Sequence, residues 1–87
     1  MRVSGRVQGV GFRWWARQHA SRLGLVGWVM NANDEQCVEL VAEGNREELD
    51  EMEQLMRTGP DGARVASAEA SRSLASGEFD DFGIVRP

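Results

Sequence analysis

Gly5-Arg6-Val7-Gln8-Gly9-Val10-Gly11-Phe12-Arg13 is the most informative segment of this chain for its fold. It continues a short strand-like run that begins at Met1, and it leads into a segment with helical periodicity. Three glycines within seven residues indicate a loop of unusual backbone geometry, because glycine adopts positive φ angles at little steric cost. A strand, a glycine-rich loop and a helix are therefore expected in direct succession.

This loop is a candidate anion site. Glycines let successive backbone N–H groups converge on one point, and the first turn of the following helix adds unpaired N–H groups and the positive end of its dipole. Arg13 falls in that turn, where the dipole disfavours a cation by roughly 0.3 to 1 kcal/mol. A bound phosphate would explain Arg13, because guanidinium offers forked donors to phosphate oxygens, although a glycine-rich stretch alone is more often a simple turn.

Two commoner phosphate motifs are excluded by the residues present. A P-loop needs a lysine, and all ten basic residues of the chain are arginine. A dinucleotide fingerprint needs a third glycine after Gly9 and Gly11, and the chain has Trp14 at that position. Any phosphate site must therefore rely on backbone amides and arginine.

The apolar periodicity of the chain predicts two helices. The first begins at Phe12 and ends near Gly24, a plausible C-cap. The second follows Asn45, which with Glu48 resembles a capping arrangement, and ends before Gly59-Pro60. The apolar stripes that support these helices are Phe12, Trp15, Ala16, Ala20 and Leu23 in the first, and Leu49, Met52, Leu55 and Met56 in the second.

Strands are expected over 25–31 and 37–42, joined as a hairpin by the polar residues 32–36, and again over 64–72 and 79–85. The order strand, helix, strand, strand, helix, strand, with a short last strand, predicts an α+β fold. Its architecture is a ferredoxin-like open-faced α/β sandwich with a mainly antiparallel sheet and two helices on one face. Because this architecture carries many unrelated activities, the fold does not give the function.

Length, net charge and cysteine content narrow the domain number, the partners and the compartment that we expect. With 87 residues, a single domain over 1–87 is expected, and it buries only about 60 to 65% of its unfolded surface. The net charge of −4 argues against a nucleic-acid partner. The chain also has no long apolar run, so we expect no membrane partner. The single Cys37 cannot form a disulfide within the chain, so we expect a cytoplasmic protein. Separately, we expect a monomer.

Two segments of the chain, residues 4–13 and 24–31, closely resemble the two signature segments of the acylphosphatase family. They read Ser4-Gly5-Arg6-Val7-Gln8-Gly9-Val10-Gly11-Phe12-Arg13 and Gly24-Leu25-Val26-Gly27-Trp28-Val29-Met30-Asn31. The similarity continues through 38–44, the second helix and 79–86. It implies a ferredoxin-like fold, no metal or other cofactor, and hydrolysis of a small acyl phosphate to carboxylate and inorganic phosphate.

The resemblance also implies roles for single residues. Arg13 matches the arginine that binds phosphate, and Asn31 matches the asparagine that positions the attacking water. The residues matching the backbone cradle for the phosphate are Gln8, Gly9, Val10, Gly11 and Phe12. Two features depart from the family: the first strand starts almost at Met1, and the turn after Asn31 is glycine-free and one residue longer.

Other residues receive structural interpretations. We expect His19 to be structural or partly exposed, Cys37 to pack in its strand, and Trp15 rather than Trp14 to face the core; Trp14 either walls the substrate mouth or is merely exposed. The acids of the second helix are expected to form a solvated face. The alternative to an enzyme is a non-catalytic anion-binding or interaction module of the same fold.

Overall fold

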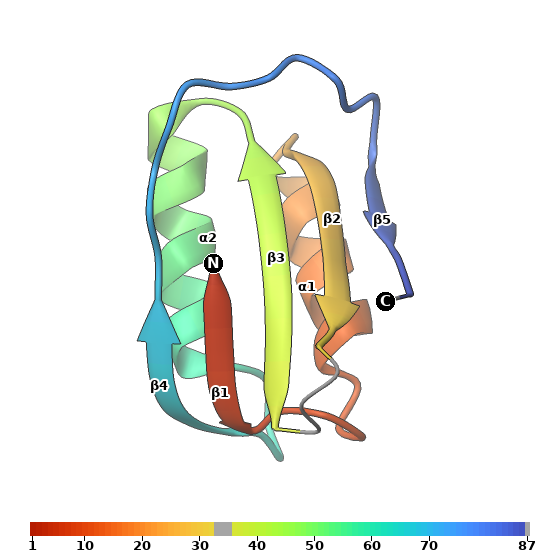
Figure 1. Cartoon of the computed structure of the whole chain (residues 1–87), viewed down its shortest axis with the longest axis vertical. Helices are drawn as coiled ribbons and strands as arrows, with labels where there is room; N and C mark the ends of the chain where they lie inside the picture. The colour runs from red at the N-terminus through yellow and green to blue at the C-terminus, as the bar shows by residue number, and fades with distance from the viewer. Residues whose placement is uncertain (33–35, 87) are drawn as a thin grey trace.

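The structure, a computed structural model, describes residues 1–32 and 36–86. Five strands form one sheet in the order β4-β1-β3-β2-β5, and both helices lie behind it in Figure 1. The elements are β1 (Arg2–Arg6), α1 (Phe12–Arg22), β2 (Val26–Asn31), β3 (Cys37–Glu43), α2 (Arg46–Thr58), β4 (Arg64–Glu69) and β5 (Phe82–Ile84). The predicted ferredoxin-like α+β fold is confirmed.

The sheet is mainly antiparallel, as expected, because only the β2–β5 pair is parallel. The short β1 lies in the interior of the sheet, where Val3 is paired with Val38 on one side and with Ala68 on the other. Its register against β4 shifts between Ser4 and Gly5, and Gly5 has a φ of 131°, a conformation that side-chain-bearing residues rarely adopt. The glycine thus lets the strand bend just before the loop.

The core lies between the sheet and the helices. On α1 the buried residues follow the predicted stripe, and two of them are alanines, which let the helix approach the sheet closely. On α2 the stripe is methionine-rich, and these flexible side chains fill the remaining space. The buried core comprises Val3, Val7, Phe12, Ala16, Ala20, Leu25, Val29, Val38, Leu40, Met52, Met56 and Phe82.

Several boundaries differ from those expected. The fourth strand ends at Glu69 and the last starts at Phe82, so residues 70–81 connect them as a long irregular segment (Figure 1). Residues 70–78 are all exposed and mostly small or polar, so they have no apolar face to bury in a sheet. Asn45 is the N-cap of α2, but its side chain forms no capping hydrogen bond.

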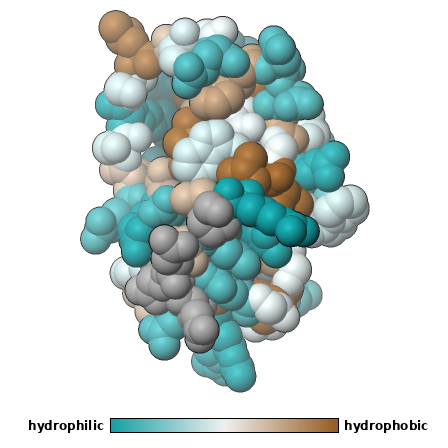
Figure 2. All heavy atoms as spheres, turned by 45° about the vertical axis from the view of Figure 1, so that its right-hand side comes forward, coloured by the Kyte–Doolittle hydropathy of each residue, from teal (hydrophilic) through white to brown (hydrophobic). Residues whose placement is uncertain are grey.

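The ends of the first helix match the expectation more closely. Leu23 is the C-cap of α1, and the next residue, Gly24, has a φ of 73°, the left-handed conformation that terminates many helices. Three residues of the predicted hairpin turn, 33–35, lie outside the described part of the chain. No described helix has the length and apolar character needed to cross a bilayer. Figure 2 shows hydrophilic side chains over most of one face, with small hydrophobic areas between them.

Candidate active site

The loop between β1 and α1 is shaped by two glycines in left-handed backbone conformations. Gly9 and Gly11 adopt left-handed φ angles of 74° and 75°, and a Cβ at either position would meet no atom within 4 Å. Glycine is therefore favoured here by the backbone angle rather than by crowding. Gly11 is also the N-cap of α1, and it has no side chain that could cap the helix. The first hydrogen bond of the helix runs from the N–H of Trp15 to the carbonyl of Gly11 at 3.0 Å. The N–H groups that precede it therefore have no side-chain cap.

Arg13 is the second residue of α1 and is half-buried. Within the described residues its guanidinium forms no hydrogen bond and no ion pair. The first turn of α1 also contains no acidic residue to offset its charge. A cation at the positive end of a helix dipole, without a protein partner, is thus available to an anion in the loop.

Asn31 is the last residue of β2, where it is paired with Val38 of β3. In the described part of the chain its side-chain amide has no hydrogen-bond partner. The end of β2 and the loop that precedes α1 lie at the same, lower end of the molecule in Figure 1. The fold thus places Arg13, Asn31 and the loop 8–12 at one end of the sheet.

Gln8 connects the loop to the hairpin through its side chain, a role that the sequence did not indicate. Its amide nitrogen Nε2 donates to the carbonyl oxygen of Cys37 at 2.7 Å and lies 3.4 Å from that of Ala32. The N–H of Ala32 donates to the same Cys37 oxygen at 3.0 Å. Because Ala32 directly follows Asn31, these hydrogen bonds connect the loop to the strand end that carries Asn31.

His19 and Cys37 both have structural partners. His19 packs edge-on against Trp15, with ring centroids 4.9 Å apart, and its Nδ1 lies 2.9 Å from Nη2 of Arg22. Cys37 is buried, and its Sγ is 3.2 Å from the Ser4 hydroxyl. These interpretations are confirmed.

The acids of α2 face solvent or pair with arginines, as expected. Among residues 1–32 and 36–86, no group of three or more His, Cys, Asp or Glu side chains lies close enough together to hold a metal ion.

The two tryptophans of α1 have different surroundings, as expected. Trp15 packs against the core, whereas Trp14 is 56% exposed.

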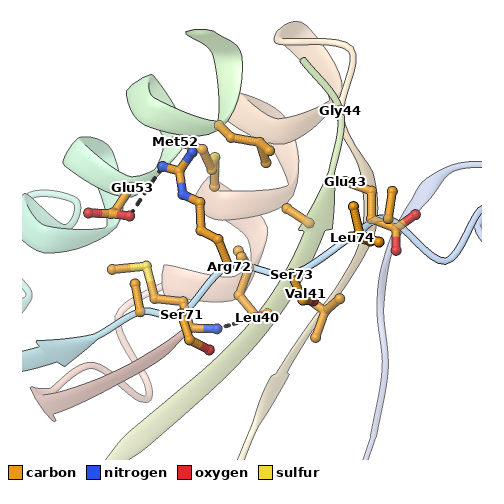
Figure 3. A pocket seen from close by; sticks show the side chains of 15 residues that line it. Leu40, Val41, Glu43, Gly44, Met52, Glu53, Ser71, Arg72, Ser73 and Leu74 are labelled. Carbon is orange, nitrogen blue, oxygen red and sulfur yellow. Dashed lines mark hydrogen bonds and ion pairs between the residues drawn. The ribbon is translucent and has the colours of Figure 1, made fainter. Parts of the chain in front are cut away.

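A cavity of about 400 Å³ lies elsewhere, between the end of β3, α2 and residues 70–75 (Figure 3). Its charged side chains already have partners. Arg72 lies 2.8 Å from Asp50 and 3.3 Å from Glu53, and Glu43 accepts hydrogen bonds from Ser76 and Gly77. None of the predicted site residues lines this cavity. The cavity is therefore separate from the predicted phosphate site.

The chain is similar to known proteins in sequence and in structure. Residues 1–84 match the family described as Acylphosphatase. The acylphosphatase of Methylococcus capsulatus is 46% identical over 97% of this chain and 90% of its own length, and that of Methanothrix thermoacetophila is 45% identical over 98% and 92%.

Solved structures agree with the sequence comparison. The crystal structure of acylphosphatase from Bacillus subtilis superposes with a TM-score of 0.90 at 34% identity, covering 97% of this chain and 92% of that one. The whole of this chain also matches 12% of the chain in the crystal structure of T.kodakarensis HypF, at 29% identity and a TM-score of 0.81. With a family match over residues 1–84 and identities above 40% along nearly its whole length, the chain belongs to the acylphosphatase family.

Proposed function

We propose that the acylphosphatase activity indicated by family membership is the hydrolysis of small acyl phosphates by a single domain, residues 1–87, without a metal ion or cofactor. The products are a carboxylate and inorganic phosphate. The observation that carries this proposal is Arg13, which stands without a partner among the described residues at the start of a helix, directly after a left-handed glycine loop.

In this proposal the phosphoryl group lies in the loop 8–12. Backbone N–H groups and the forked guanidinium of Arg13 stabilise its equatorial oxygens, where charge is spread in the transition state. A cation in the first helical turn is unfavourable in the free protein and becomes favourable once the anion is bound. The site therefore gains most of its charge complementarity only with substrate present.

The Asn31 side-chain amide holds a water molecule in line with the P–O bond that breaks. The water oxygen bonds to phosphorus, the carboxylate departs with the bonding electron pair, and a water proton passes to a phosphate oxygen. Because a carboxylate is a good leaving group, positioning and charge stabilisation suffice without a strong general base. Gln8 supports this geometry by tying the loop to the residue after Asn31.

Phosphate release from acetyl phosphate, measured with excess EDTA, tests the proposal. Turnover that EDTA does not reduce, and that Arg13→Ala abolishes, is the expected result. Folded wild-type protein that binds phosphate without turnover would instead favour the alternative, a non-catalytic anion-binding module. Activity that requires an added divalent metal would contradict the metal-free mechanism.

A further inference from the structure

The ionisable residues of α1 are all basic. Residues 12–22 include three arginines and one histidine but no acid, in a chain whose net charge is −4. Arg22, near the end of the helix, pairs with Glu51 of α2 at 3.1 Å. In the described part of the chain, neither Arg13 nor Arg17 forms an ion pair with a carboxylate. The uncompensated charge thus lies in the half of α1 next to the loop.

Arg13 and Arg17 share one face of the helix, because residues four apart are neighbours with Cβ atoms roughly 5 to 6 Å apart. Like charges at this spacing destabilise a helix, and the positive end of the dipole adds to that cost at Arg13. Arg13 is accounted for by the phosphoryl group. Arg17 is one turn further on and needs a separate explanation.

Trp14 positions the second arginine. The guanidinium carbon of Arg17 lies 5.4 Å from the centroid of the Trp14 ring, a distance at which a cation is attracted to the ring face. Trp14 belongs to the first turn, so the Arg17 side chain extends back toward the loop rather than away from it. Trp14 is 56% exposed and Arg17 is exposed too, so the arginine is accessible to a ligand.

We propose that Arg17 is a specificity-determining residue that binds a second anionic group on the acyl part of the substrate. This inference rests on the proposed function, in which Arg13 takes the phosphoryl group. The preferred substrates are then acyl phosphates whose acyl group carries a carboxylate a few bonds from the anhydride. Trp14 holds Arg17 in position and packs against the acyl chain between the two charges.

Two rigid substrates of matched shape test this inference: 3-carboxybenzoyl phosphate, which carries the second charge, and 3-methylbenzoyl phosphate, which does not. The ring prevents the carboxylate from attacking its own anhydride. We expect kcat/KM of the wild type to be higher for the carboxylate substrate, and added salt to reduce the ratio, because exposed charges are screened. In Arg17→Gln the ratio should fall about threefold to tenfold.

Arg17→Lys should retain part of the ratio, and Trp14→Leu should lower it less than Arg17→Gln does. Arg64→Gln is the matched control, because Arg64 is an exposed arginine at the same end of the sheet, without an ion pair in the described residues. An unchanged ratio in Arg17→Gln, or an equal fall in Arg64→Gln, would overturn the inference. Failure of the wild type to hydrolyse either substrate would instead contradict the proposed function.

Discussion

The side-chain amide of Gln8 donates a hydrogen bond to the backbone carbonyl of Cys37 at 2.7 Å, across 29 positions of sequence. The same oxygen accepts the N–H of Ala32, so one acceptor joins the loop to both strands of the hairpin. The proposed anion cradle and Asn31 come from different elements, and this contact ties the loop to the strand end that carries Asn31.

Gln8→Ala should therefore impair catalysis more than its stability cost suggests. Loss of the hydrogen bonds is expected to lower the free energy of unfolding by about 0.5 to 1.5 kcal/mol. Displacement of the loop relative to Asn31 should lower kcat by about tenfold to a hundredfold, because such chemistry depends on positioning. Gln18→Ala, an exposed position on α1, is the control for acetyl phosphate kinetics and urea unfolding. Normal kcat in Gln8→Ala would show that the link is structural only.

Asn31→Ala separates turnover from binding. If the amide holds water rather than substrate, kcat should fall about a hundredfold to a thousandfold, the range found when one stabilising donor is removed. The inhibition constant of inorganic phosphate should stay close to that of the wild type. A parallel loss of phosphate affinity would place Asn31 in the cradle instead.

Much of the fold was predictable from sequence because local and long-range signals agree. The apolar stripe from Phe12 to Ala20 and the glycines at 9, 11 and 24 fixed α1 and its ends, and these residues are buried or left-handed as required. The extent of β4 and β5 was less predictable. Strand ends depend on pairing with neighbouring strands. The N–H groups of Ser76 and Gly77 donate to the Glu43 carboxylate, a long-range contact that has no local sequence signature.

The site was predicted unevenly for a similar reason. Loop and helix signals are local, so nearby residues were enough to make Gly9, Gly11 and Arg13 a candidate anion site, which stays a prediction. The position of Asn31 came from family resemblance, since its neighbours along the chain indicate only a turn. The side-chain link from Gln8 to Cys37 joins residues far apart in sequence and has no local signature.

Glu43 gives a pH-dependent prediction at the other end of the molecule. Its carboxylate accepts hydrogen bonds from the backbone N–H and hydroxyl of Ser76, both at 2.8 Å, and from the N–H of Gly77 at 3.1 Å. These donors, the Ser76 N–H first, hold the pKa of Glu43 below its ordinary value of 4.5. The carboxylate is therefore stabilising above pH 4.5, and this contribution is lost as the pH falls through the lowered pKa.

The difference in unfolding free energy between wild type and Glu43→Gln should accordingly be largest near neutral pH and shrink as the pH falls below 4.5. Urea unfolding at a series of pH values measures it. Glu69→Gln serves as the control, because Glu69 is exposed and accepts no hydrogen bond from a described side chain or loop N–H. A difference that grows toward low pH would contradict the proposed role of the Glu43 carboxylate.

Arg13 allows function and stability to be measured against each other. If it stands at the start of α1 to meet an anion, phosphate should raise the melting temperature of the wild type. Linkage gives about 2.7 kcal/mol at one hundred times the dissociation constant. Arg13→Gln should lose most of this gain, and Arg13→Lys should recover only part of it, because a point charge replaces a fork.

Without anion, the same Arg13→Gln substitution has the opposite sign. It removes a cation from the positive end of the α1 dipole, where no described acid offsets it, so the free energy of unfolding should be unchanged or higher by up to about 1 kcal/mol. Calorimetry in phosphate-free buffer, with and without added phosphate, measures both effects on one sample. An anion-free Arg13→Gln protein that melts far below wild type would show that the arginine is structural. Arg13 would then not be explained by a bound anion, although the chain would still belong to the acylphosphatase family.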